Sequence, residues 1–340
     1  MKFKVVQLRE SNDLEGDIML KILHSNRKKK VTFNGFLSGI PARDYVFQDT
    51  PYEEQVKEAA KMIKEADFCL IGAGAGTSTA AGVAYGGRFF AENFKEFIEK
   101  YPGPYMKDMY SAGFYSYPTE EAKWGYWSKH ALLGGADIPA LPLYRQMYEL
   151  LKDKNYFVLT TNVDEQFRKA GFDKDRIFAT QGSYERIQCK RACHFKTYNA
   201  VDMFRQMDQA RKDCCVPSYM VPKCPVCGGP MEMNLRSDNY FVEDESWYAA
   251  EGYFGKFVEE ALSEGKKVCL LDLGTGFNTP TIIRFPFEKL IREYHNTVMV
   301  RLNLNEAVVQ KSQAHREIGI NADMAKCIPD ILEAMKNERD

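Results

Sequence analysis

Polar side chains that can do chemistry follow two short apolar stretches of this sequence. Asn162 and Asp164 come after residues 156–160, and Gln181 comes after residues 178–180. If both stretches are parallel strands of an open α/β sheet, these side chains lie beyond the strand ends, where such sheets bind ligands. Amides and carboxylates placed there can hydrogen-bond a ribose or a carboxamide. The alternative is that Asn162 or Asp164 caps a helix and that Gln181 belongs to an ordinary turn.

A glycine-rich turn follows an earlier apolar stretch, residues 68–71. Its sequence is Gly72-Ala73-Gly74-Ala75-Gly76-Thr77-Ser78. Glycines let backbone N–H groups approach a pyrophosphate, and the start of a following helix favours negative charge. Threonine replaces the third glycine of the dehydrogenase fingerprint, and residues 91–96 look helical where a ribose-binding acid should follow a second strand. The turn predicts a phosphate site outside the dehydrogenases, with close helix packing as the alternative.

Four of the nine cysteines have the spacing of metal ligands. Cys189 and Cys193 precede Cys224 and Cys227 by about thirty residues, and the second pair lies in a Cys-Pro-Val-Cys-Gly-Gly turn. Two such pairs suit tetrahedral Zn²⁺, and four protein ligands leave no open position for catalysis. We therefore predict a structural zinc, with unligated thiols as the alternative. Three nearby side chains could replace one ligand: His194, Cys214 and Cys215.

A second glycine turn follows the apolar stretch 268–273. Gly274 and Thr275 lie in this turn, and Asn303 follows a further apolar stretch, 297–302. Together these residues could close over the far half of a dinucleotide. The alternative is that they form two ordinary turns between strands and helices.

The elements around these motifs predict a parallel, doubly wound, Rossmann-like α/β sheet. Apolar stretches of four to six residues alternate with helical stretches such as 52–66 and 141–152. Residues 89–150 indicate an irregular, packed insertion. Cysteines, prolines and polar turns interrupt the alternation later, so we predict an inserted zinc ribbon. The predicted parts are an N-terminal extension at 1–50 with a short strand at 31–36, a Rossmann-like domain at 51–184 and 246–335, and a zinc-binding module at 185–245.

Composition excludes several classes of function. The chain has 46 basic and 47 acidic residues and a net charge of −1, so no overall attraction to nucleic acid or anionic membrane exists. No apolar run is long enough to span a bilayer, and the basic N-terminus lacks the apolar core of a signal peptide. Without a secretion signal, the cysteines are expected to be thiols or metal ligands. We predict a cytoplasmic protein with neither nucleic-acid nor membrane partners.

The order of these motifs resembles that of the sirtuins over roughly residues 55–335. A Gly-Ala-Gly loop, a Thr-x-Asn-x-Asp strand end and an x-Gly-Ser turn come first. Two cysteine pairs, a glycine–threonine turn and a late asparagine then follow in the same order as in that family. The resemblance implies a Rossmann-like domain, a small zinc-binding domain and NAD bound in the cleft between them.

The resemblance also implies roles for individual residues. Asn162, Asp164 and Gln181 would be catalytic, orienting the reacting ribose and holding the nicotinamide. Arg88 would replace an arginine that sirtuins carry after the first loop. Residues 241–243 resemble the strand that pairs with an acyl-lysine peptide. The full set of NAD contacts would be Gly74, Ala75, Gly76, Ser78, Arg88, Thr161, Gly274, Thr275, Asn303, Asp323 and Met324.

Two residues depart from the sirtuin pattern. Thr161 stands where glutamine is usual, and Gln181 stands where sirtuins usually carry a histidine. A sirtuin deacylase needs a base to deprotonate a ribose hydroxyl, and histidine, with a pKa of about 6.5, can accept that proton. Glutamine only forms hydrogen bonds at neutral pH, and general-base catalysis typically contributes about 10²–10⁴-fold. Cleavage of the glycosidic bond needs mainly positioning, which Asn162 and Gln181 can still provide.

This pattern, with the tyrosine-rich segment after the first loop, resembles the class M sirtuins, which are associated with macrodomains. The resemblance implies an NAD-dependent protein mono-ADP-ribosyltransferase that acts on a lipoyl-carrier protein and is linked to a macrodomain hydrolase. Two alternatives stay open. One is a deacylase or delipoylase in which another group replaces the base, and the other is a non-catalytic sensor of NAD or ADP-ribose.

Overall fold

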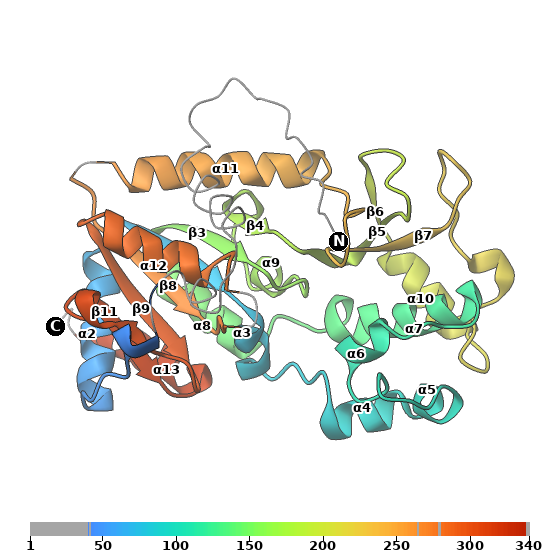
Figure 1. Ribbon diagram of the computed structural model, residues 1–340, viewed down its shortest axis with the longest axis horizontal. Coiled ribbons are helices and arrows are strands. Elements are labelled where there is room, and N and C mark those ends of the chain that lie inside the picture. Colours follow the sequence, from blue (N-terminus) through green and yellow to red (C-terminus); the bar gives the residue numbers. More distant parts are fainter. Residues whose placement is uncertain (1–39, 41, 264, 278–279, 338–340) are drawn as a thin grey trace.

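The computed structural model describes residues 40, 42–263, 265–277 and 280–337. Figure 1 shows a large α/β body that contains the C-terminal helix and a second group of helices and strands beside it. The predicted strand at 31–36, and most of the predicted N-terminal extension, lie outside the described residues.

Six parallel strands form the main sheet, in the order β11-β9-β8-β2-β3-β4. Strand β2 has β3 on one side and β8 on the other, so the direction of winding reverses between β2 and β8. Such a reversal is the topological switch point of a doubly wound sheet, and the predicted fold class is confirmed. The strands are β2 (Phe68–Ala73), β3 (Asn155–Thr160), β4 (Ile177–Ala179), β8 (Val268–Leu273), β9 (Thr297–Asn303) and β11 (Glu317–Asn321).

Helices cover both faces of this sheet, so the strands are buried on both sides and appear in the sequence as continuous apolar runs. The covering is visible in Figure 1. One face packs against α2 (Tyr52–Glu65), α8 (Pro142–Leu151) and α13 (Met324–Asn337). The other face packs against α11 (Glu245–Ala261) and α12 (Arg284–Glu293). The bounds of α2 and α8 agree with the prediction to within one residue.

Strand β11 is the one main strand that the sequence pattern does not indicate, because it begins with a buried acid. Glu317 accepts hydrogen bonds from the backbone and side-chain amides of Gln310, and burial raises the pKa of Glu317 to about 7. Nearby, Arg301 donates to Asp272 at 2.7 Å and to Glu288 at 3.0 Å. Buried charges are tolerated only when they are paired in this way. The network therefore joins β8, β9 and α12 beneath the second glycine turn.

A three-stranded antiparallel sheet, in the order β6-β5-β7, forms a second core. Its strands are β5 (Gly182–Cys189), β6 (Thr197–Asn199) and β7 (Met231–Leu235). Helices α7 (Glu120–Ala131) and α10 (Val201–Ala210) pack on this sheet. Three helices pack on α7 in turn: α4 (Gly87–Asn93), α5 (Lys95–Lys100) and α6 (Met109–Gly113). The packed insertion predicted before β3 thus joins the inserted module, as Figure 1 shows, while the predicted domain boundaries stay a prediction.

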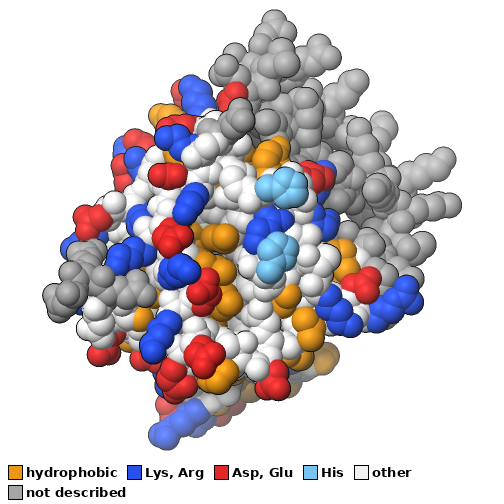
Figure 2. All heavy atoms as spheres, turned by 90° about the vertical axis from the view of Figure 1, so that its left-hand side faces the viewer, with side chains coloured by type: hydrophobic (Ala, Val, Ile, Leu, Met, Phe, Trp, Pro, Cys, Tyr) orange, Lys and Arg blue, Asp and Glu red, His pale blue; other side chains and the backbone are white. Residues whose placement is uncertain are grey.

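Besides five short 3₁₀ or π-helical turns, the described chain has four further short elements. They are α3 (Ala75–Ala80), α9 (Gln166–Lys169) and the antiparallel pair β1 (Tyr45–Val46) and β10 (Val309–Gln310). Figure 2 shows that Lys and Arg side chains are interspersed with Asp and Glu on the face at the left of Figure 1. That face therefore carries no extended field of one sign. Within the described ranges, no helix is both long and apolar enough to cross a membrane.

Candidate functional site

The two glycine turns meet at the switch point between β2 and β8. The Gly74 N–H donates to the Leu273 carbonyl at 2.9 Å, and the Gly76 N–H donates to the Gly274 carbonyl at 3.1 Å. A Cβ on Gly76 would lie 2.7 Å from that Gly274 oxygen, so only glycine permits the contact. Close packing against Gly274, the alternative explanation of the turn, therefore accounts for Gly74 and Gly76. The Ala75 N–H has no acceptor among the described residues, and as the first N–H of α3 it can meet an anion.

A cavity of about 190 Å³ opens between the two turns. Because pockets for drug-sized ligands hold about 300–1,000 Å³, it fits one part of a dinucleotide. All lining residues except Gly276 and Ile283 belong to the predicted NAD contacts, and no polar pattern marks Ile283 in the sequence. The lining consists of Gly74, Ala75, Gly76, Thr161, Gly274, Thr275, Gly276, Ile283 and Asn303.

Replacing Gly274 by alanine is expected to weaken NAD binding. Gly274 has a φ of +61°, and a Cβ there would lie 2.5 Å from the Thr77 nitrogen, so the turn must move. We expect a loss of affinity of about tenfold or more, equivalent to about 1.4 kcal/mol, measured by titration calorimetry. The matched control is Gly252→Ala, because a Cβ there meets nothing within 4 Å. Equal NAD affinity in both variants would contradict a role for this turn.

Asn162 ties the end of β3 to the first glycine turn. Its Nδ2 donates to the Gly74 carbonyl at 3.0 Å and lies 3.5 Å from the Tyr144 hydroxyl. Tyr144 was not predicted as a site residue. Its only sequence signal is its position on the buried face of α8, where a tyrosine hydroxyl needs a partner.

Asp164 is buried beneath this amide. One of its carboxylate oxygens accepts from the Ser78 hydroxyl at 2.5 Å, and the other accepts from the Gln166 N–H at 3.1 Å. Burial raises the pKa of the Asp164 carboxyl. The Ser78 hydroxyl also lies 3.0 Å from the Tyr144 hydroxyl. Ser78 is therefore engaged with Asp164 and Tyr144 and does not line the 190 Å³ cavity.

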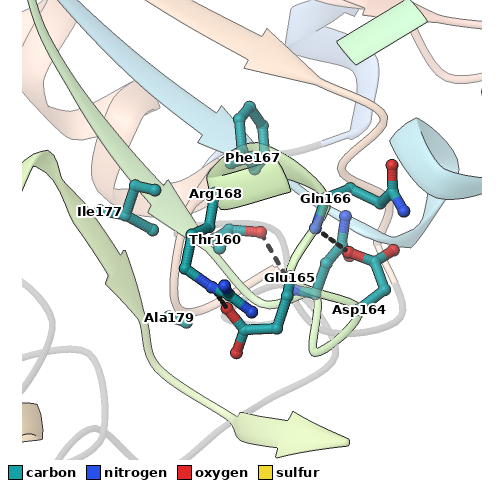
Figure 3. A pocket seen from close by; sticks show the side chains of 9 residues that line it. Thr160, Asp164, Glu165, Gln166, Phe167, Arg168, Ile177 and Ala179 are labelled. Carbon is teal, nitrogen blue, oxygen red and sulfur yellow. Dashed lines mark hydrogen bonds and ion pairs between the residues drawn. The ribbon is translucent and has the colours of Figure 1, made fainter. Parts of the chain in front are cut away.

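A smaller cavity of about 20 Å³ lies beside the same loop, and Figure 3 shows its walls. Asn162 and Asp164 line it together with Glu165 and Arg168, which pair with each other at 3.1 Å. The volume is enough for about one water molecule, and the lining combines polar side chains with Phe167, Ile177 and Ala179. Glu165 has a left-handed φ of 60°, and such strain in a non-glycine residue is often found at functional sites.

Gln181 extends from the neighbouring strand end. In the sheet register, Ala179 pairs with Thr160, and the Thr180 N–H donates to the Thr160 carbonyl at 3.0 Å. Asn162 and Gln181 therefore leave adjacent parallel strands at the same edge of the sheet. The half-buried Gln181 side chain donates from Nε2 to the Thr180 hydroxyl at 3.2 Å.

The side chains of Thr275 and Asn303 shape the second turn. The Thr275 hydroxyl donates to the buried Asp272 carboxylate. Asn303 donates from Nδ2 to the Thr275 carbonyl at 2.9 Å and accepts from the Glu306 N–H at 3.0 Å. Both residues line the cavity, but these polar groups are engaged in holding the turn that follows β8.

Besides Ser78, three predicted NAD contacts are not brought to either described cavity. Arg88 lies on α4 with its side chain 90% exposed and pairs with Glu92 at 2.6 Å. The exposed Asp323 accepts from the Ala325 N–H at the start of α13. The Met324 side chain is buried in the core beneath the main sheet. Roles for these residues in NAD binding stay predictions.

The four predicted zinc ligands converge. Their Sγ atoms all lie within 4.8 Å of one another. The Cys189–Cys227 separation is 3.7 Å, and the Cys193–Cys224 separation is 3.6 Å. A tetrahedral Zn²⁺ with Zn–S bonds of about 2.3 Å requires sulfur atoms about 3.8 Å apart. The geometry therefore fits a closed, structural zinc site.

The possible substitute ligands lie outside this set of four sulfurs. His194 is adjacent, with Nδ1 3.1 Å from the Cys193 sulfur, but its Nε2 faces the Tyr198 hydroxyl at 2.7 Å. Cys214 and Cys215 are not part of the cluster. No disulfide joins any of the nine cysteines, all of which belong to the described chain.

Solved sirtuin structures share this fold. A Sir2 homologue in complex with NAD is 13% identical, with a TM-score of 0.54 over 88% of this chain and 100% of that chain. A structure that addresses the mechanism and regulation of Sir2 enzymes is 16% identical, with a TM-score of 0.51 over 84% of this chain and 100% of that chain. The chain therefore has a sirtuin-type fold.

Two proteins are similar to most of this sequence. The protein ADP-ribosyltransferase of Staphylococcus aureus (strain Mu50 / ATCC 700699) is 34% identical over 284 residues, which are 82% of this chain and 89% of that protein. A probable bifunctional ADP-ribose hydrolase/ADP-ribosyltransferase of Fusarium oxysporum f. sp. cubense is 29% identical over 299 residues, 84% of this chain. The match covers 49% of the Fusarium protein, so this chain spans about half of it.

No protein-family model matches the chain. The likeness to the Staphylococcus protein shows the family, and the chain belongs to the sirtuin-like protein ADP-ribosyltransferases. The predicted ADP-ribosyltransferase activity is confirmed at the level of this family.

Proposed function

We propose that Asn162, Asp164 and Gln181 form the reacting end of the NAD site of this enzyme. The single observation that carries the proposal is the position of Asn162 and Gln181 at adjacent strand ends, with Asn162 directly after Thr161, which lines the switch-point cavity. NAD supplies an ADP-ribosyl group with nicotinamide as the leaving group. The bond from ribose C1′ to nicotinamide breaks with its electron pair leaving on nicotinamide. A heteroatom of the acceptor protein then bonds to C1′ and gives up its proton.

Two side-chain amides would orient the ribose. The Asn162 NH₂ group donates a hydrogen bond to the Gly74 carbonyl, and the Gln181 NH₂ group donates one to the Thr180 hydroxyl. Each amide then has its carbonyl oxygen left for the sugar. Fixed oxygen dipoles favour the positive charge that develops on a ribose as its leaving group departs. Asp164, held by Ser78 and Gln166, would support the loop and face the nicotinamide.

The residue at position 181 favours transfer over deacylation. A glutamine amide cannot remove a proton from a ribose hydroxyl at neutral pH. In the transfer reaction the acceptor itself supplies the nucleophile, and the site needs to position it. A deacylase or delipoylase, and a non-catalytic sensor, are therefore less well supported as functions of the same pocket.

The test is an incubation with NAD, candidate acceptor proteins and an acylated peptide. We expect release of nicotinamide and a mass gain of one ADP-ribose on an acceptor protein, both measured by mass spectrometry. Formation of O-acyl-ADP-ribose from the peptide would favour the deacylase instead. Tight NAD binding without nicotinamide release would favour the sensor.

Replacing Gln181 by histidine separates the two chemistries further. We expect Gln181→His to lose transfer, because the shorter ring cannot reproduce the contact with Thr180, and to gain little deacylation. The control is Gln206→His on the exposed side of α10, which should keep full transfer. A strong gain in deacylation by Gln181→His would mean that only a base was missing from a deacylase site.

Three finer assignments belong to the same proposal. The resemblance to the class M sirtuins supports a lipoyl-carrier protein as acceptor. The Fusarium relative, whose name joins an ADP-ribose hydrolase to an ADP-ribosyltransferase, supports a link to a macrodomain hydrolase. Cysteines that lie either singly or in a metal-ligand cluster, rather than in disulfides, support a cytoplasmic location. Comparing lipoylated and unlipoylated carrier as acceptors tests the first assignment, since equal modification would argue against lipoyl recognition.

A further inference from the structure

One arginine holds the backbone at Gln181. The Arg236 N–H donates to the Gln181 carbonyl at 3.0 Å. The Arg236 side chain contacts the preceding residue, because its Nε donates to the Thr180 carbonyl at 3.2 Å. Arg236 follows β7, so two segments more than fifty residues apart in sequence are joined at this point.

The Arg236 guanidinium is itself fixed from several sides. Its Nη2 pairs with the Glu243 carboxylate at 2.6 Å. The guanidinium carbon lies 4.2 Å from the centre of the Phe241 ring and 5.6 Å from that of Trp247. Glu243 also accepts from the Tyr248 hydroxyl at 3.2 Å. A planar fork that both pairs with a carboxylate and stacks on rings is specific to arginine, and lysine cannot reproduce it.

The backbone after Gln181 is restrained by close packing instead. Gly182 has a φ of +91°, and a Cβ there would lie 1.9 Å from the Asn234 carbonyl oxygen. Before Gln181, Thr180 is bound by Thr160 on one side and by Arg236 on the other. Among these restraints on the backbone around Gln181, the bond to the Thr180 carbonyl is the one that the Arg236 guanidinium makes.

We propose that Arg236 is a positioning residue of the transfer reaction: its guanidinium, fixed by Glu243, holds the Thr180 carbonyl and thereby aims Gln181 at the reacting ribose. This inference rests on the proposed role of Gln181. It also gives residues 241–243 a part in the site. That segment is irregular where the resemblance implied a strand, and it carries the acid and the ring that hold Arg236.

The first test replaces Arg236 by methionine, which keeps much of the apolar contact with Phe241 and Trp247, keeps the backbone bond to Gln181 and removes the side-chain hydrogen bonds. We expect kcat for nicotinamide release to fall about 10- to 100-fold, because small displacements of a reacting group can cost about 10²-fold. The KM for NAD should change less than about threefold, since the lost interaction acts in the transition state. Arg236→Lys should lie between wild type and Arg236→Met.

The second test is a double-mutant cycle with Gln181→Ala. If Arg236 acts through Gln181, adding Arg236→Met to Gln181→Ala should cause no further loss of kcat. Losses that multiply would overturn the inference and leave the proposed function standing. Full activity of Gln181→Ala would instead overturn the proposed role of Gln181.

Hydrogen exchange gives a reading that does not depend on activity. Amides of residues 178–183 should exchange faster in Arg236→Met than in wild type, and unchanged exchange there would contradict the inference. The matched control is Arg186→Met, which removes another arginine–carboxylate pair of the same sheet, to Asp244 at 3.3 Å. The control should keep kcat, and an equal fall in both variants would show that Arg236 acts only through stability.

Discussion

Replacing Asn162 by alanine is expected to reduce the rate of nicotinamide release by about 10²–10³-fold, the cost typical of losing one fixed polar group that stabilises a transition state. The variant loses the amide that the Gly74 carbonyl holds in place. It also loses the bond that joins the β3 loop to the first glycine turn. Initial rates of nicotinamide release at saturating NAD, followed by chromatography, measure the effect.

The control for this variant lies on the same strand. Asn155 begins β3 at the opposite edge of the sheet and pairs with Arg176 at 2.8 Å. Asn155→Ala should therefore lower the melting temperature to a similar degree while leaving the rate within about twofold. If Asn162→Ala kept near wild-type activity, the reacting end of NAD would lie elsewhere.

Loss of zinc is expected to have the second large effect. A Cys224→Ser variant should bind less than one zinc per chain and should lose several kcal/mol of stability, because the binding energy of a structural zinc is folding energy. Transfer should fall with it, since β5 runs from Gly182, next to Gln181, to the ligand Cys189. Elemental analysis, thermal melting and the transfer assay measure the three outcomes.

Another cysteine serves as the control for the zinc variant. Cys215 is half-buried and lies outside the four-sulfur cluster, so Cys215→Ser should keep one zinc and full transfer. Chelation of wild-type protein should reproduce the Cys224→Ser result. A Cys224→Ser protein with one bound zinc and an unchanged melting temperature would refute the four-cysteine site.

Taken together, these variants separate the parts of one site. Gly274 belongs to the turn that would hold the adenosine half, and Asn162 to the end where nicotinamide would leave. Gln181 lies beyond Asn162 and connects to the zinc-bearing sheet through β5 and to Arg236 through its backbone. Damage to the zinc site is therefore expected to affect chemistry more than NAD affinity.

The central strands of the main sheet were predictable because they are buried on both faces. Residues 268–273 contain five apolar side chains, and the predicted strand coincides with β8. The positions beyond the strand ends then followed from the rule that parallel strands expose their carboxyl ends at one edge. The four sulfurs were predictable for a similar reason, since the spacing of Cys224 and Cys227 suits one metal.

The use of individual side chains was not predictable in this way. Ser78 was predicted as an NAD contact, and the sequence does not reveal that its hydroxyl donates to Asp164. Strand β11 was missed because its buried Glu317 has a partner, Gln310, that the strand pattern does not reveal. Arg236 looks like a surface charge in the sequence, because its contact with Thr180 crosses more than fifty residues.

The sequence by itself indicated the family, the polar residues that follow the strands, the four cysteine ligands of the zinc site and the glutamine in place of a histidine at position 181. Those features are local, because residue type and short spacing specify a strand, a turn or a pair of ligands. Only the tertiary structure decided that Gly74 and Gly76 pack on Gly274, that Ser78 turns inward, and that Arg236 holds the backbone at Gln181. Such contacts join segments that are far apart in the sequence. The spacing of residues within one segment does not specify which distant segment it will contact.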